Sequence, residues 1–118
     1  MIPHETIVAL ATPSGAGAIA IIRLSGADAI AIAAEVFESV SGKDISKQKT
    51  HTIHLGHIVD GKKVYDQVLL SIFKGPNSYT GENVVEISCH GSVFIQQQII
   101  QLLLRKGAKM AQAGEFTL

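Results

Sequence analysis

The fold class of this chain follows from one segment, which reads Thr52-Ile-His-Leu-Gly-His-Ile-Val-Asp-Gly-Lys-Lys-Val-Tyr-Asp-Gln-Val-Leu-Leu-Ser-Ile-Phe73. Two runs rich in branched apolar residues, 52–59 and 63–73, flank Asp60-Gly61, a dipeptide that is strongly favoured in tight hairpin turns. We therefore expect an antiparallel β-hairpin. In its second arm, four apolar residues share one parity and should face the core together: Val64, Val68, Leu70 and Ile72.

Four further segments are expected to be strands. Residues 6–12 and 18–24 are short apolar runs rich in branched side chains, and such runs predict buried strands. Between them, residues 13–17 contain the Pro and Gly that favour a turn. Residues 83–89 predict another strand and residues 108–113 a last one.

A first helix is expected after the second of these strands. Ser25 can cap its N-terminus, and Asp28 in the first turn suits the positive end of the helix dipole. Gly42 is the expected stop, and residues 43–50 form a polar connector. The apolar face at helical spacing consists of Ile30, Ala33, Ala34 and Phe37.

Residues 91–106 give the clearest helical pattern, and Gly107 is expected to end that helix. One side is apolar and the other carries amides. The apolar side consists of Ile95, Ile99, Leu102 and Leu103, and the polar side of Gln96, Gln97 and Gln101.

The expected order is strand, strand, helix, hairpin, strand, helix, strand. This order predicts an α+β fold, a mixed β-sheet with two main helices. The chain has 118 residues, a length that suits one domain over residues 1–118.

The composition excludes several classes of protein. A 47% hydrophobic chain with ten basic and ten acidic residues is not intrinsically disordered. Its apolar runs are too short for a membrane span, and no secretory signal precedes them. The single cysteine, Cys89, rules out an internal disulfide framework. We expect a cytoplasmic protein, and zero net charge predicts little direct nucleic-acid binding.

The sequence contains one of two common nucleotide-binding motifs and lacks the other. The run Gly15-Ala16-Gly17-Ala18-Ile19-Ala20 satisfies G-x-G-x-x-[GA], which binds a dinucleotide only where it opens a helix. Strand-forming residues follow it here, so a plain turn is favoured. No G-x-x-x-x-G-K-[ST] occurs, and the chain therefore holds no phosphate-binding P-loop.

Two groups of residues could in principle bind a metal or act as a nucleophile, but their spacing favours a structural role. His51, His54 and His57 are spaced three apart, which on a strand sends His54 to the opposite face from the other two. Three ligands cannot converge from that arrangement. Cys89 and His90 are neighbours on a strand and should also face opposite sides, so a nucleophile–base pair is disfavoured.

The segment 74–83 and the strand after it are harder to assign. This loop is dense in hydrogen-bonding side chains, Asn77 and Tyr79 among them, and a long surface turn is the plainer interpretation. Glu86 lies among apolar residues and must face water, a partner or a ligand. Arg23 presents the same question with opposite charge. An ion pair between Arg23 and Glu86 is one answer, and a ligand site is the other.

Three ordered blocks carry a resemblance to the bacterial tRNA-modification GTPase family MnmE, also called TrmE. The first is the run from Thr6 to Gly26, with its Ala-Thr-Pro-Ser-Gly-Ala-Gly-Ala-Ile segment. The second is Gly75-Pro-Asn-Ser-Tyr-Thr-Gly-Glu-Asn-Val-Val-Glu86 followed by His90-Gly91, and the third is Gly107 with Ala113-Gly-Glu-Phe-Thr117. Together they resemble the N-terminal domain of that family.

The chain departs from the family pattern at Asn83, where Asp is usual, and at Ser92, where a second Gly is usual. The family continues with a basic segment, a helical domain and a GTPase domain. We therefore expect this chain to be the excised N-terminal domain.

The resemblance implies a folate-binding domain, similar to the tetrahydrofolate-binding part of the glycine-cleavage T protein, that holds formyl-tetrahydrofolate or another reduced one-carbon folate. Arg23 and Glu86 match family folate contacts, and a further lysine contact lies beyond Leu118. Asn77 and Tyr79 are expected to line the same site. No catalytic residue and no metal site is implied for this segment, and the family domain forms a homodimer.

For the longer protein, the resemblance implies potassium-stimulated GTP hydrolysis with Mg²⁺. That protein would work with the flavoprotein MnmG (GidA) to add an aminomethyl-type group to the wobble uridine of tRNA, and the folate would supply the one-carbon unit. Two alternatives stay open. One is a folate-dependent one-carbon transferase related to the T protein, and the other is a dimerisation module with a vestigial folate site.

Overall fold

The predicted hairpin is present and forms the longest strand pair of the sheet. In the computed structural model, which describes residues 5–13, 15, 17–75 and 82–111, β4 (Thr52–Asp60) pairs antiparallel with β5 (Lys63–Phe73). The turn lies one residue later than expected. Asp60 pairs with Lys63, so Gly61 and Lys62 form the turn, and Gly61 supplies its positive φ of 59°.

A β-bulge in this hairpin overturns one sequence prediction. The register shifts between Ile58, which pairs with Asp66, and Val59, which pairs with Val64, so Tyr65 is the extra residue of β5. The shift reverses the side-chain alternation, and Val64 is exposed rather than facing the core with Val68, Leu70 and Ile72.

The hairpin belongs to a seven-stranded sheet of order β3-β4-β5-β6-β2-β1-β7. Its other strands are β1 (Ile7–Leu10), β2 (Ile19–Ser25), β3 (Phe37–Ser39), β6 (Val84–His90) and β7 (Lys109–Met110). β1 and β7 run parallel, and the other described pairs are antiparallel. The α+β class, the mixed sheet and the two main helices are therefore confirmed.

The first helix is shorter than its pattern predicts. α1 (Ala29–Val36) has Asp28 as its N-cap, and Ser25 is not the cap because it still pairs with Ile7 and Val84 in the sheet. Phe37 begins β3 instead of continuing the apolar face. Gly42 therefore does not end a helix and lies in a turn with a φ of 75°. A 3₁₀ turn at Ile45–Lys47 interrupts the connector.

The second helix follows its pattern with one exception. In α2 (Val93–Arg105), Ser92 caps the N-terminus, where its hydroxyl oxygen accepts from the Ile95 N–H. Gly107, with a φ of 116°, follows the C-terminus. Gln96 was expected on the polar side but is buried. Its side-chain amide donates hydrogen bonds to the carbonyls of Gly15 and Gly91.

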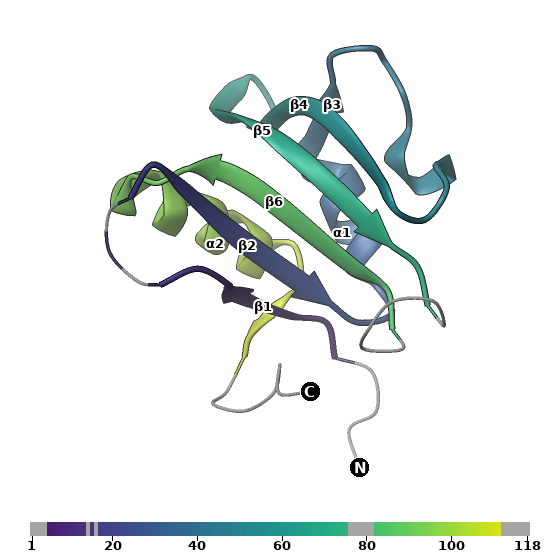
Figure 1. Cartoon of the computed structure of the whole chain (residues 1–118), viewed down its shortest axis with the longest axis horizontal. Coiled ribbons are helices and arrows are strands. Elements are labelled where there is room, and N and C mark those ends of the chain that lie inside the picture. Colours follow the sequence, from purple (N-terminus) through teal and green to yellow (C-terminus); the bar gives the residue numbers. More distant parts are fainter. Residues whose placement is uncertain (1–4, 14, 16, 76–81, 112–118) are drawn as a thin grey trace.

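Both helices lie on one face of the sheet (Figure 1). The core is the layer between the two helices and the sheet. It consists of apolar side chains from both helices and from alternate strand positions. Ile22 on β2, Leu70 on β5 and Ile87 on β6 are fully buried there, together with Ile99 and Leu102 on α2. The opposite face of the sheet carries neither helix.

Candidate functional site

The helix-free face of the sheet, called here the open face, carries several exposed aliphatic side chains. Alternation along the paired strands turns Ile19, Ile53, Leu55 and Leu69 to it. Their exposed fractions are 65%, 65%, 43% and 47%. Several exposed aliphatic side chains on one face are typical of a surface that contacts a partner or ligand.

Arg23 and Glu86 lie opposite each other near the middle of this face. The pairing of β2 with β6 sets Arg23 directly across from Glu86. Arg23 Nε donates to Glu86 Oε2 at 2.8 Å, and Nη2 lies 2.6 Å from the same oxygen. The two side chains are only 21% and 22% exposed. The structure thus contains the ion pair that the sequence analysis left as one interpretation.

Both contacts from Arg23 use one carboxylate oxygen. In the described part of the chain, Glu86 Oε1 accepts no hydrogen bond. A carboxylate can accept about four hydrogen bonds. The geometry therefore pairs the charges of Arg23 and Glu86 and still leaves acceptor capacity on the open face.

Most of the segment 74–83 lies outside the described residues. Asn77 and Tyr79, expected to line the site, belong to that part and their placement is not tested. The described ends of the loop are held by Asn83. Its side-chain oxygen accepts from the Gly75 N–H at 3.0 Å, and its carbonyl accepts from the Gly26 N–H at 3.0 Å.

A second polar pair, not foreseen from the sequence, lies at the far end of β6. Asp66 accepts from the His90 backbone N–H through Oδ2 at 2.8 Å and contacts His90 Nδ1 through Oδ1 at 2.7 Å. The Asp66 side chain is 8% exposed and that of His90 is 68% exposed. Asp66 lies in the unbroken part of the β4–β5 register, opposite Ile58, and meets His90 beyond the last paired residues of β5 and β6.

Cys89 and His90 do not form a nucleophile–base pair. Cys89 is buried in the core, whereas His90 is exposed and binds Asp66. Burial, followed by the nearby Asp66 charge, raises the pKa of the Cys89 thiol to about 11. A thiol with that pKa is protonated and unreactive at neutral pH.

The three spaced histidines diverge as predicted. His54 is buried on the core side and its pKa is lowered, first by burial and then by Lys43. His57 lies on the opposite face of β4, and His51 precedes the strand and contacts Phe73 edge-on. No group of three or more His, Cys, Asp or Glu residues in the described ranges could hold a metal ion.

The glycine-rich run Gly15–Ala20 does not open a helix. β2 begins at Ile19, which is the arrangement of a turn and not that of a dinucleotide site. The buried Gln96 amide holds this run, because its Nε2 donates to the Gly15 carbonyl at 3.1 Å and to the Gly91 carbonyl at 2.9 Å. The spacing of Gln96 to Ile99 and Leu103 was the signal that could have predicted its burial.

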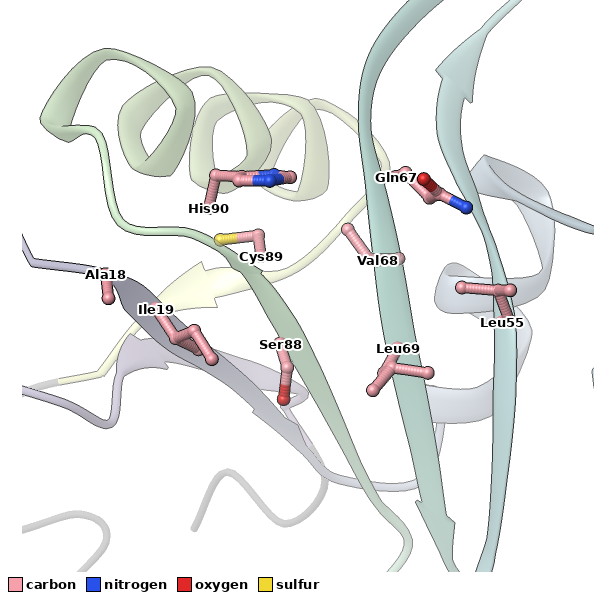
Figure 2. A pocket seen from close by; sticks show the side chains of 9 residues that line it. All are labelled: Ala18, Ile19, Leu55, Gln67, Val68, Leu69, Ser88, Cys89 and His90. Atoms are coloured by element: carbon pink, nitrogen blue, oxygen red, sulfur yellow. The ribbon is translucent and has the colours of Figure 1, made fainter.

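A pocket of about 290 Å³ opens on the same sheet, near the end of β6 (Figure 2). Ile19, Leu55 and Leu69 line it from the open face, and Ser88, Cys89 and His90 line it from β6.

None of the helices in the described ranges is long and apolar enough to cross a membrane.

Comparison with known proteins identifies the family of this sheet domain. A family model described as "GTP-binding protein TrmE N-terminus" matches residues 6–118. The chain is 81% identical over 118 residues to a protein of Flavobacterium psychrophilum named tRNA modification GTPase MnmE, and covers 26% of it. It is 71% identical over 118 residues to the protein of that name from Flavobacterium johnsoniae, covering 25%. For the Bacillus subtilis protein the identity is 49%, over 96% of this chain and 25% of the relative.

The molecule is thus an α+β domain with a one-sided helix layer. The chain belongs to the family of N-terminal domains of the tRNA modification GTPase MnmE, or TrmE. It spans about a quarter of the length of these relatives.

Proposed function

We propose that this chain is the folate-binding, homodimerising N-terminal domain of a GTP-hydrolysing tRNA modification protein. The proposed ligand is formyl-tetrahydrofolate or another reduced one-carbon folate, bound by residues within the single domain 1–118. The observation that carries the proposal is the mostly buried Arg23–Glu86 pair, which shares the open face with several exposed aliphatic side chains.

The carboxylate on this face fits the hydrogen-bonding pattern of a reduced pterin. A pterin presents an exocyclic amine beside a ring N–H, and a carboxylate accepts two such parallel donors in a forked pair. Glu86 keeps Oε1 for one donor while Oε2 is shared with Arg23. Arg23 orients the carboxylate through Oε2 and is proposed to contact a folate oxygen. Asn77 and Tyr79 are proposed to complete the site.

The remainder of the proposal comes from family membership. The likeness of this fold to the folate-binding part of the glycine-cleavage T protein is proposed on that basis. In the longer protein, a separate domain would bind GTP, Mg²⁺ and K⁺. That protein would act in the cytoplasm with MnmG on the wobble uridine of tRNA, with the folate as the one-carbon source. This domain would supply the carbon-donor site and touch little of the tRNA.

A second copy of the chain is the proposed partner of the exposed aliphatic residues on the open face. Ile53 and Leu55 lie on β4, away from the Arg23–Glu86 pair. Burying such side chains against a like surface is favourable, at about 25 cal/mol per Å² of apolar area. Homodimer contacts are accordingly more apolar than ordinary protein surface.

Calorimetric titration of the chain with formyl-tetrahydrofolate tests the proposal. We expect saturable micromolar binding, about 8 kcal/mol. Glu86→Ala should weaken binding by at least about tenfold because the acceptor of both pterin donors is removed. Glu35→Ala, an exposed glutamate on α1, is the matched control and should bind as the parent chain does.

Unaltered binding by Glu86→Ala would show that the assigned site is wrong. The same variants, measured by analytical ultracentrifugation, separate folate binding from dimerisation. A dimer with no folate affinity in the parent chain would favour a dimerisation module with a vestigial site. That alternative has one observation in its favour, because Arg23 already occupies one oxygen of Glu86.

A further inference from the structure

Basic side chains meet where the turn of the β4–β5 hairpin lies against the C-terminus of α2. Arg105, at the end of α2, donates from Nη2 to the Tyr65 hydroxyl oxygen at 3.2 Å and lies 3.7 Å from Asp60 Oδ2. Lys63 Nζ lies over the same Tyr65 ring, 4.8 Å from its centroid, in a cation–π contact. The hairpin and the helix are thus joined through Tyr65, with a cation from each element on it.

The charge of this region is positive although the whole chain is neutral. Two more basic residues adjoin the contact, one in the turn and one directly after α2. The four cations together are called here the basic corner: Lys62, Lys63, Arg105 and Lys106. Segments 60–66 and 105–106 contain these cations and two carboxylates, so they carry a net charge of +2 and the rest of the chain −2. Asp60 contacts Arg105, and Asp66 contacts His90.

Folding explains only part of this gathering of cations. The helix dipole favours basic residues at the C-terminus of α2, which accounts for Arg105 and Lys106. The two lysines of the hairpin turn have no such reason. The exposed contact between Arg105 and Asp60, at 3.7 Å, contributes little stability. Cations that lie close together repel one another, and an anionic partner relieves that repulsion.

The basic corner continues into an uncharged stripe along α2. No Asp or Glu occurs from Gly91 to Met110. Gln101 and Arg105 follow Phe94 by seven and eleven residues, which places the three side chains on one line of the helix. All three are exposed, Phe94 to 70%. An aromatic ring, an amide and a guanidinium on one face are side chains that contact the bases, sugars and phosphates of RNA.

The charge and shape of these groups favour a nucleic-acid backbone over an acidic protein surface. RNA presents regularly repeated phosphates together with bases that stack on aromatic side chains. In the described part of the chain, Arg105 Nε and Nη1 donate no hydrogen bond. A guanidinium with donors to spare matches the fork geometry of a phosphate. An acidic protein would pair with the cations but would leave the exposed Phe94 ring without a role.

We propose that the basic corner and the α2 stripe contact the sugar–phosphate backbone of tRNA. The four cations of the basic corner pair with phosphates, and Phe94 stacks on an unpaired base at the other end of α2. This inference rests on the proposed function, in which the longer protein acts on tRNA and this domain touches little of it. It gives that small contact a place on the side of the sheet that carries the helices, apart from the Arg23–Glu86 pair.

Fluorescence anisotropy with an end-labelled, unmodified tRNA transcript tests the inference. At about 150 mM salt the parent chain should bind with a Kd of about 10–100 µM, which is the range of sequence-independent binding. The logarithm of the affinity should fall with that of the salt concentration with a slope near −3, because a neutralised phosphate contributes about 0.7–0.9. Replacing two cations, by Lys62→Gln with Arg105→Gln, should reduce that slope by about 2 and weaken binding at least about fivefold.

A matched control removes two positive charges elsewhere. Lys47→Gln with Lys49→Gln changes two exposed lysines of the 43–50 connector. This connector precedes Thr52, and Asp60 at the other end of β4 is eight residues farther, about 26 Å along the strand. The control should keep the parent affinity within about twofold. Equal weakening by the two double variants would mean that net charge alone governs binding, and would overturn the basic corner as the site.

A further variant distinguishes RNA from an acidic protein. Phe94→Ala removes the stacking surface and should weaken tRNA binding about fivefold or more without changing the salt slope. Poly-glutamate with the same number of charges as the tRNA should compete poorly. Competition as strong as that of unlabelled tRNA, together with no effect of Phe94→Ala, would assign the basic corner to an acidic protein surface and overturn the proposal.

Folate titration of the same variants separates this inference from the proposed function. All of them should bind formyl-tetrahydrofolate as the parent chain does. Folate binding without any tRNA binding would overturn this inference alone, and a parent chain that binds neither would overturn both. Binding of tRNA through the basic corner by a chain without folate affinity would overturn the folate site alone. Should circular dichroism show the first double variant unfolded, Lys62→Gln with Lys106→Gln is judged by the same slope.

Discussion

The two faces of the sheet differ in how completely their side chains are buried. On the helix-covered face, alternate residues such as Leu70 and Ile87 are fully buried against α1 and α2. On the open face, their neighbours include Leu69, about half exposed, and the Arg23–Glu86 pair. The apolar residues of the covered face are explained by folding alone, because the helices bury them. The open face combines exposed aliphatic residues with a nearly buried charge pair, which is the pattern of a binding surface.

The largest expected effect contrasts the two faces at adjacent residues. Leu70→Ala removes a fully buried side chain and should lower the free energy of unfolding by about 2–5 kcal/mol. Leu69→Ala is the matched change on the open face and should cost less than about 1 kcal/mol. Urea denaturation measures both. Equal losses under conditions where the chain is monomeric would contradict this difference between the two faces.

The next effect concerns the contact that holds the glycine-rich run. A Cβ on Gly91 would meet the Gly17 carbonyl oxygen, and these two glycines are joined by a backbone hydrogen bond of 3.1 Å. Gly91→Ala should therefore cost about 1–3 kcal/mol in unfolding free energy. Gly17→Ala places its Cβ 3.9 Å from the nearest atom and serves as the control. A neutral Gly91→Ala would contradict the close approach.

A smaller effect is expected from the charge pair on the open face. In a double-mutant cycle of Arg23→Met and Glu86→Gln, the coupling in unfolding free energy should be about 1 kcal/mol. The value is modest because about a fifth of each side chain remains in water. The denaturation measurement used for the core variants is sufficient. A coupling near zero would mean that Arg23 and Glu86 do not interact in solution.

The last effect belongs to Cys89 on the covered face and is absent at neutral pH, because it appears only at alkaline pH. Its thiol pKa is raised from 9.0 to about 11, so the unfolded thiol loses its proton at lower pH than the folded one. This contribution to stability is fully present below pH 9 and is lost as pH rises through 9 to about 11. Cys89→Ala should lose less stability than the parent chain across that range. If the unfolding free energy of the two chains fell equally with pH in this range, the raised pKa of the Cys89 thiol would be contradicted.

The sequence predicted the covered face better than the open one. Apolar periodicity located both helices, the hairpin and the core positions of β5 from Val68 onward, because burial on one face repeats at a fixed spacing. It misplaced Val64, since a bulge reverses the alternation without a residue signature. Periodicity also wrongly predicted Phe37 to be helical. In the structure Phe37 pairs with Ile58 in the sheet, and this pairing overrides the local helical spacing.

The candidate site was predictable only in part. A carboxylate and a guanidinium within apolar strands identified Glu86 and Arg23 as residues in need of an explanation. Their direct contact depends on the register of two strands far apart in the chain, which no local pattern reports. The Asp66–His90 pair was missed for the same reason, since it depends on how β5 and β6 lie beyond their last paired residues. Asn77 and Tyr79 lie outside the described residues, and their role stays a prediction.

The pairing of β2 with β6 also determines when the site forms as the chain folds. Arg23 and Glu86 are 63 residues apart in sequence, whereas β4 and β5 meet across a two-residue turn. Closing a long loop before its contacts form is slow, so a local hairpin can form first and distant strands join later. A nascent or partly folded chain can thus contain the hairpin without any ligand site. Ligand binding would then report the completed sheet and stabilise only that state.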